Sequence, residues 1–149
     1  MTCKGQDFRF NHKADVYYAE DVYNEWNEFE KVWVLGHEGA LCELASDKFN
    51  SDTRYAIQNK LQLFDMPLLV FGRFKDDIRT KDGVTHSLTD IMVTNVRSYC
   101  EDTPIFIESA DNNAVTDFEI GSFQPFTNPW GKIEYYKVQA IRMDDQRQL

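Results

Sequence analysis

The sequence lacks the features that mark membrane, secreted or nucleic-acid-binding proteins. Its longest apolar run, around residues 67–71, is far shorter than the roughly 20 residues that cross a bilayer. Residues 1–10 contain no apolar segment of the kind found in secretory signals. Bases are scarce, because 16 Lys and Arg stand against 25 Asp and Glu and give a formal net charge of −9. We therefore expect no membrane contact, synthesis and retention in the cytoplasm, and poor binding to a phosphate backbone.

Motifs for catalysis and metal binding are missing as well. No P-loop, GxGxxG or GxSxG pattern occurs, and adjacent acids such as Asp76 and Asp77 point to opposite faces of a strand. A structural zinc site needs four ligands, usually in two close pairs, whereas the cysteines and histidines are scattered. They are Cys3, Cys42, Cys100, His12, His37 and His86. We predict reduced thiols, no metal or other cofactor, and no enzymatic activity.

The chain does contain enough apolar material for one folded domain, since 42% of its 149 residues are hydrophobic and 14% are aromatic. Short apolar or β-branched segments between turn residues predict a mainly β fold. The expected strands are 14–18, 32–35 continued by 41–44, 68–74, 91–96, 105–107, 118–120 and 133–143. The first two should pair as a hairpin, with a bend at Gly36 and Gly39, and Lys81-Asp82-Gly83 indicates a turn. We predict a small antiparallel β-barrel or sandwich formed by residues 1–149 as a single domain.

One excursion between the predicted strands is unusually long. Within residues 46–65, Ile57, Leu61 and Phe64 fall at i, i+4 and i+7, which predicts one short helix. The helix should end before Pro67, because the residue that precedes a proline avoids the helical region. Long excursions of this kind in compact domains are often functional. We take the helix-bearing loop as the working part of the molecule and the barrel as its scaffold.

Two further segments have unusual composition. Residues 14–30 carry six acids and no base, which describes either a solvated hairpin or an acidic surface that faces a basic partner or a DNA conduit. Residues 121–131 carry two prolines and three aromatic residues and are expected to form an irregular loop. Trp26, Trp33 and Trp130 are expected to pack in the core or at an interface rather than to form a sugar or base platform.

The order of these features resembles the head-completion or stopper proteins of tailed bacteriophages, which are small β-barrels of the head–tail joining group. The hairpin of residues 14–18 with 29–44 resembles the family's opening pair of strands. Residues 43–65 resemble its long loop bearing a short helix. Within them, Tyr55-Ala56-Ile57-Gln58-Asn59-Lys60-Leu61-Gln62 is similar to the Tyr- and Gln-rich helix found there.

The second half of the chain continues the resemblance. Residues 68–79 resemble the family's strand followed by an Asp-rich turn, and residues 89–95 and 135–141 resemble its last two strands. The likeness covers most of residues 8–99 and 132–145. Residues 100–131 stand where the family usually has a short turn, so we interpret them as an insertion that docks a neighbouring ring.

The resemblance implies a ring of identical subunits, commonly six, in the neck of the virion between the portal with its adaptor and the tail. It implies assembly in the host cytoplasm and no reaction. The long loops would point at the central channel and hold packaged double-stranded DNA, without sequence-specific contacts, until the tail attaches and DNA is ejected. The candidate gating residues are Lys48, Asn50, Asp52, Arg54, Tyr55, Gln58, Asn59, Lys60 and Gln62. The candidate inter-ring docking residues are Phe123, Phe126 and Trp130.

Other roles stay open on the sequence alone. A tail-terminator or adaptor ring would occupy another layer of the same neck, and the order of rings in a particle would distinguish it. A small acidic binding or inhibitor protein with a basic target would be monomeric at high dilution and would not need the long loop. An enzyme would need a pocket in which acids with strongly shifted pKa values converge.

Overall fold

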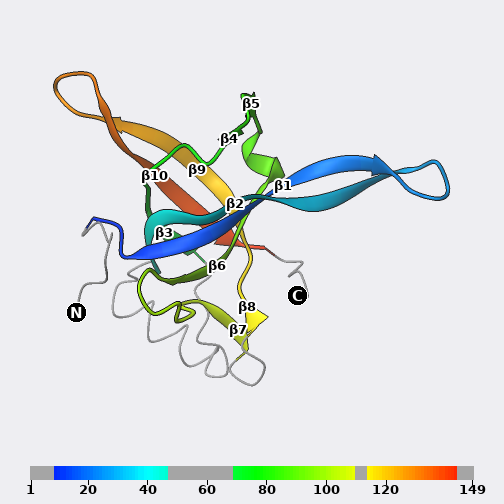
Figure 1. Cartoon of the computed structure of the whole chain (residues 1–149), viewed down its shortest axis with the longest axis horizontal. Helices are drawn as coiled ribbons and strands as arrows, with labels where there is room; N and C mark the ends of the chain where they lie inside the picture. The colour runs from blue at the N-terminus through cyan, green and yellow to red at the C-terminus, as the bar shows by residue number, and fades with distance from the viewer. Residues whose placement is uncertain (1–8, 47–68, 110–113, 144–149) are drawn as a thin grey trace, which may run out of the picture.

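The computed structural model describes residues 9–46, 69–109 and 114–143, and within them six strands close into an antiparallel barrel (Figure 1). In order around the barrel these are β1 (His12–Tyr23), β2 (Phe29–Ser46), β3 (Leu69–Phe74), β10 (Ile133–Arg142), β9 (Phe118–Thr127) and β6 (Ile91–Ser98). Strand β6 pairs back onto β1 and completes the closure. The predicted mainly β fold is confirmed, whereas the helix expected within residues 46–65 lies outside the described residues.

Small elements decorate the barrel. The β4 (Thr80–Lys81) and β5 (Val84–Thr85) hairpin turns at Asp82 and Gly83, whose φ angles are 53° and 81°. Positive φ at both central residues is typical of a tight hairpin turn, so the predicted turn is confirmed. A 3-10 turn η1 (Leu88–Asp90) leads into β6, and β7 (Ile107–Ser109) pairs with β8 (Ala114–Val115). Within the described ranges, no helix has the length and apolar character needed to cross a membrane.

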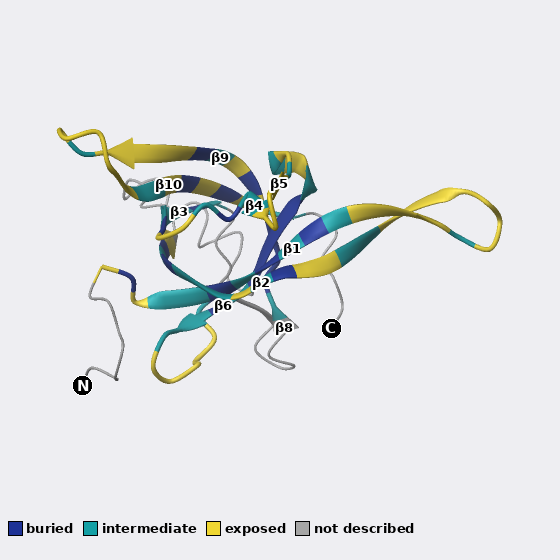
Figure 2. Ribbon diagram, turned by 45° about the horizontal axis from the view of Figure 1, so that its top comes forward, coloured by how far each residue is buried: buried dark blue, intermediate teal, exposed yellow. Residues whose placement is uncertain are grey.

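The core lies inside the barrel, and the exposure of the residues rises toward the ends of the long hairpins (Figure 2). Alternate residues of each strand point inward, as the two-residue period of a strand requires. On β10, for example, Val138 and Ala140 are buried, and the residues between them face outward. The largest fully buried side chains are Phe10, Phe74, Phe118, Ile78, Ile91 and Met92.

The bend predicted in the second strand is present. Register shifts between Ala14 and Tyr17 on β1 are matched by extra residues on β2, in the stretch that contains Gly36 and Gly39. Gly39 has a φ of 70°, a conformation that glycine adopts without steric cost. The shifts are β-bulges, which increase the local twist of a hairpin and help a sheet to curl into a barrel.

The structure differs most from the sequence interpretation at residues 121–131. Strand β9 continues to Thr127, so residues 121–127 are strand rather than irregular loop. Pro125 is tolerated there because this part of β9 pairs only with β10, and a free strand edge needs no N–H donor. Residues 118–127, expected within an insertion at 100–131, therefore form a strand of the barrel itself.

The cysteines of the described residues differ from one another. Cys42 is free and completely buried in the barrel, and burial raises the pKa of its thiol. Cys100 is disulfide-bonded. The expectation of reduced thiols is therefore wrong for Cys100.

Candidate functional site

The structure describes only some of the residues that the sequence predicts to be functional. All nine gating candidates, from Lys48 to Gln62, lie outside the described residues. Among the docking candidates, Phe123 is only 6% exposed and belongs to the core, where its ring stacks on Tyr136 with centroids 5.2 Å apart. Phe126 and Trp130 are exposed. The single chain thus leaves two of the three docking candidates available to a partner.

Two β-ribbons extend beyond the barrel wall in different directions (Figure 1, Figure 2). The pairing of β1 with β6 ends at Tyr18, so residues 19–23 pair only with residues 29–33 of β2. The pairing of β3 with β10 ends at Tyr136, so the first residues of β10 pair only with β9. We call residues 19–33 the β1–β2 arm and residues 124–135 the β9–β10 arm.

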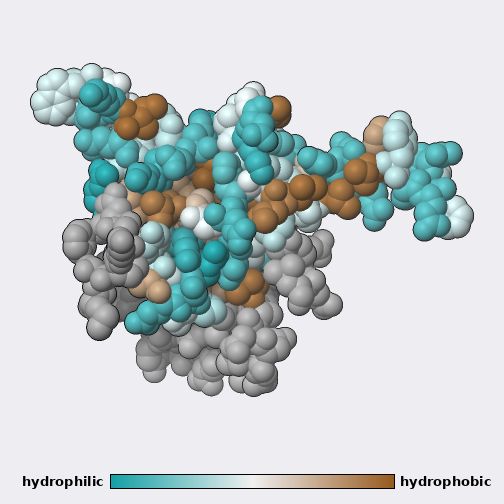
Figure 3. Space-filling view, viewed as in Figure 1, coloured by the Kyte–Doolittle hydropathy of each residue, from teal (hydrophilic) through white to brown (hydrophobic). Residues whose placement is uncertain are grey.

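Exposed apolar side chains concentrate on these arms. Apart from Val84 and Ile141, every exposed large hydrophobic residue of the described ranges lies on an arm or at its root. They are Val22, Tyr23, Trp26, Phe29, Val34, Leu35, Phe126, Trp130 and Ile133. Figure 3 shows apolar surface running along the β1–β2 arm, outside the barrel. Because a lone two-stranded ribbon is only marginally stable and exposed apolar clusters mark interaction sites, both arms are candidate contact surfaces.

The β1–β2 arm ends in a turn that fixes a tryptophan in solvent. The side-chain oxygen of Asn24 accepts hydrogen bonds from the backbone N–H groups of Trp26 (2.9 Å) and Glu28 (3.0 Å). Asn27 has a φ of 61°, which an asparagine tolerates better than most residues. Trp26 is 76% exposed, so the turn holds a large aromatic side chain outward.

The β9–β10 arm ends in a turn of the same geometry. The side-chain oxygen of Asn128 accepts from the backbone N–H groups of Trp130 (3.0 Å) and Lys132 (2.9 Å), and Gly131 has a φ of 82°. Trp130 is 83% exposed. The two tips therefore present equivalent tryptophans, but Lys132 occupies the position that Glu28 holds in the first turn. This Asn-x-Trp pattern was not predicted, although its spacing is visible in the sequence.

The root of the β1–β2 arm is braced by the β4–β5 hairpin and its flanks. The Tyr18 hydroxyl donates a hydrogen bond to the carbonyl oxygen of Ile78. The Tyr18 ring stacks on His86 with centroids 3.9 Å apart and meets the edge of His37. Burial, with a smaller effect of the Asp77 carboxylate, raises the pKa of Tyr18 to about 12. These contacts hold the tyrosine neutral and fix the direction in which the arm leaves the barrel.

The β1–β2 arm is strongly acidic. Five acids and one lysine give residues 19–33 a formal charge of −4. The lysine, Lys31, lies 3.0 Å from a carboxylate oxygen of Asp90 in η1, and its hydrogen bond lowers the pKa of Asp90. Because the arm's only base is paired with a residue outside it, the acids around Trp26 are left to attract a basic partner.

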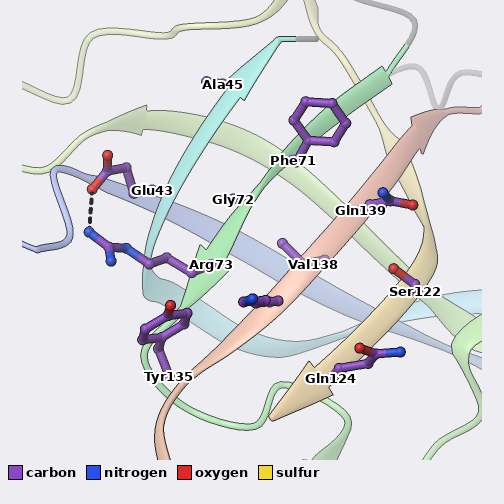
Figure 4. Close-up of a pocket in the computed structure, with 11 residues that line it drawn as sticks. Glu43, Ala45, Phe71, Gly72, Arg73, Ser122, Gln124, Tyr135, Val138 and Gln139 are labelled. Carbon is purple, nitrogen blue, oxygen red and sulfur yellow. Dashed lines mark hydrogen bonds and ion pairs between the residues drawn. The ribbon is translucent and has the colours of Figure 1, made fainter. Parts of the chain in front are cut away.

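A hollow of about 530 Å³ opens on the outer face of the barrel across β2, β3, β9 and β10 (Figure 4). Its charged lining residues are Glu43, Arg73 and Lys137, so the lining is net positive on a chain of charge −9. The Arg73 guanidinium lies 3.2 Å from a carboxylate oxygen of Glu43 and forms an ion pair with it at the rim of the hollow. We call this surface the cationic hollow.

Cations and aromatic rings alternate in and beside the cationic hollow, whose lining includes Arg73, Tyr135 and Lys137 but not Phe10 or Phe126. The Arg73 guanidinium lies 5.5 Å from the ring centroid of Phe10 and 5.2 Å from that of Tyr135. Tyr135 stacks on Phe126 at 4.8 Å, and the Lys137 ammonium lies 5.0 Å from the Phe126 centroid. Cation–π contacts of this kind pre-order long basic side chains. No local sequence pattern reveals the stack, because it joins three separate segments of the chain.

Comparison with known proteins adds no relative to this description. No family model matches the sequence, and neither a curated protein nor a solved structure is found to match it. In the part of the chain that the structure describes, no group of three or more His, Cys, Asp or Glu side chains could hold a metal ion. The candidate site is therefore defined by its geometry: two tryptophan-tipped arms and one cationic hollow.

Proposed function

We propose that the protein is a structural subunit that assembles with copies of itself into a ring, and that this ring belongs to the neck of a tailed-bacteriophage virion. The observation that carries the proposal is the pair of arms, which leave one closed barrel in different directions and, with their roots, hold nearly all the exposed large apolar side chains of the described residues. Aromatic residues that are held rigidly outward are the usual anchors of protein interfaces. The arms are thus the means by which the subunit contacts its neighbours.

Two non-equivalent contact surfaces on one subunit favour a ring over a symmetric dimer. Contacts between different surfaces of identical subunits are heterologous, and they generate a closed ring when the rotation between neighbours closes. Within the described residues the six barrel strands close on one another, which leaves free strand edges mainly along the arms. Contact with neighbouring copies therefore involves the arms.

The neck position is supported by the resemblance in the order of elements and by charge. A small barrel in which a long segment separates β2 from β3 has the expected order of the head–tail joining family. A ring of subunits that each carry a charge of −9 repels a DNA duplex, which lets the duplex slide without sticking. In this proposal residues 48–62 gate the channel, and Phe126 and Trp130 on the β9–β10 arm dock a neighbouring ring.

The proposal is tested by the mass and shape of the protein in solution. We expect sedimentation velocity over roughly three decades of concentration to show a single oligomer in exchange with monomer, as mass action requires. Electron microscopy of that oligomer should show a ring whose central channel is wide enough for a DNA duplex. A monomer at every concentration would contradict the proposal and favour a small acidic binding protein.

A further inference from the structure

We infer that the tip of the β1–β2 arm of one copy docks into the cationic hollow of the next copy, so that every contact within the ring is an arm in a hollow. The inference rests on the proposed ring and identifies the two surfaces that close it. It follows from the shape, the charge and the placement of these surfaces.

The arm tip offers an aromatic cluster with a negative rim. Tyr23 and Phe29 are each 67% exposed, and their ring centroids lie 4.3 Å apart as a cross-strand pair at the base of the turn. Trp26 stands beyond them at the tip, between Glu25 and Glu28 in the sequence. An apolar centre surrounded by charge is the pattern of an interface hot spot with its polar rim.

The cationic hollow offers a complementary surface. Its volume of about 530 Å³ lies in the range of roughly 300–1,000 Å³ typical of sites that receive a bound group. The aromatic residues Phe71 and Tyr135 line it together with the bases Arg73 and Lys137. Because Arg73 is already held against two rings, it loses little side-chain entropy on binding.

The occupant is a second copy because the arm cannot reach the hollow of its own chain. The β1–β2 arm leaves one side of the barrel, whereas β3, β9 and β10 lie on the other side in both views (Figure 1, Figure 2). The β9–β10 arm is the poorer occupant by charge. Lys132 and Glu134 leave residues 124–135 without net charge, whereas the β1–β2 arm brings a charge of −4 to the net positive lining.

The size of the contact is adequate for a stable interface. Tyr23, Trp26 and Phe29 are exposed to the extent that a partner covering all three would bury on the order of 400 Å² of their side-chain surface. This area is about half of the roughly 800 Å² that each partner contributes to an interface of standard size. On the arm's side, the flanking strand residues would have to supply the remainder.

The first test compares two tryptophans in turns of equal geometry. Trp26→Ser should weaken self-association at least about tenfold, since it removes the anchor of the contact. Trp130→Ser removes an equally exposed tryptophan from the other arm and should leave the association constant unchanged. Both are measured by sedimentation velocity, and thermal melting by circular dichroism confirms that both variants fold. Equal effects of the two substitutions would overturn the inference.

The second test reverses charge on each side of the contact. Glu28→Lys and Lys137→Glu should each weaken association roughly tenfold, and the double variant should recover most of the loss, because opposite charges then meet again. A high salt concentration should reduce all three differences. Additive losses in the double variant would contradict the pairing of these two surfaces.

The third test uses the head-to-tail geometry. Trp26→Ser retains a working hollow, and Lys137→Glu retains a working arm, so an equimolar mixture should form heterodimers that grow no further, because the remaining contact lacks its tryptophan and sets a glutamate against a glutamate. A mixture that gives only monomers or full rings would overturn the inference. If the wild type forms a ring and every one of these variants also does, the inference fails and the proposed ring stands. If the wild-type protein is monomeric at every concentration, both the inference and the proposed function fail.

Discussion

Gly36 provides the sharpest test of how the β1–β2 arm is attached. A Cβ atom built at Gly36 would lie 2.1 Å from Cε2 and 2.5 Å from Cδ2 of the Tyr18 ring. The ring cannot easily move away, because it is buried, stacked on His86 and hydrogen-bonded through its hydroxyl to Ile78. We therefore expect Gly36→Ala to lower the free energy of unfolding by about 1–3 kcal/mol, the usual cost of overpacking a core.

The sign of this effect depends on the tyrosine. Gly36 is not among the glycines with positive φ, so its backbone accepts an alanine. Without the clash, alanine in place of a glycine within a strand should stabilise by roughly 0.5–1 kcal/mol. In a Tyr18→Val background, which removes the ring, Gly36→Ala should therefore become neutral or stabilising.

Gly121 supplies a matched control on another barrel strand. A Cβ atom there would come no closer than 3.5 Å to its nearest neighbours, Gln139 and Ile141, which is ordinary contact, so Gly121→Ala should not destabilise the protein. Urea unfolding followed by circular dichroism measures all four variants, at concentrations where association is the same. The reasoning would be refuted if the Gly36→Ala variant were as stable as the Gly121→Ala variant. It would also be refuted if Gly36→Ala destabilised the protein equally with and without the Tyr18 ring.

Three further substitutions test buried and paired polar groups. Thr116→Val should raise the free energy of unfolding by about 1 kcal/mol, because the buried Thr116 hydroxyl finds no hydrogen-bond partner among the described residues; a loss of stability in urea would contradict this. Stability should fall as the pH rises from about 10 to about 12, since Tyr18 stays protonated in the fold while an unfolded tyrosine ionises near 10. Tyr18→Phe should flatten this slope in pH-dependent melts. Asp77→Asn should cost about 0.5 kcal/mol at neutral pH, the size of a solvent-screened pair, because hydrogen bonds from Arg79 lower the pKa of Asp77. The difference in the free energy of unfolding between the wild type and Asp77→Asn should reach its full size above the ordinary aspartate pKa. It should vanish as the pH falls through the lowered pKa of Asp77.

The strands were predictable where alternation and burial coincide. On β10, the two-residue spacing of Val138 and Ala140 encodes both the strand and its inward face, and both residues are buried. Strand β6 was predictable from its β-branched run instead, since its first four residues are all buried and show no alternation in burial. The distal half of β9 was not predictable, because a ribbon that extends past the core needs no apolar alternation and accepts Pro125.

The candidate site was only partly predictable. Trp130 and Phe126 were predicted to be docking residues and are exposed, and the acidity of the first hairpin was recognised, because both depend on local properties of the sequence. The cationic hollow was missed, since Arg73 meets Phe10 and Tyr135 only after the barrel closes. Phe123 was assigned to docking because its segment was expected to be a loop, whereas the inward face of β9 buries it.

The most direct test of self-assembly through the arms is an electron cryomicroscopy map of the assembled wild-type protein. We expect a closed ring in which Trp26 of each subunit lies within the hollow lined by Arg73, Tyr135 and Lys137 of its neighbour. A particle in which Trp26 stands in solvent on every subunit, or a field of single barrels at the highest usable concentration, would contradict it.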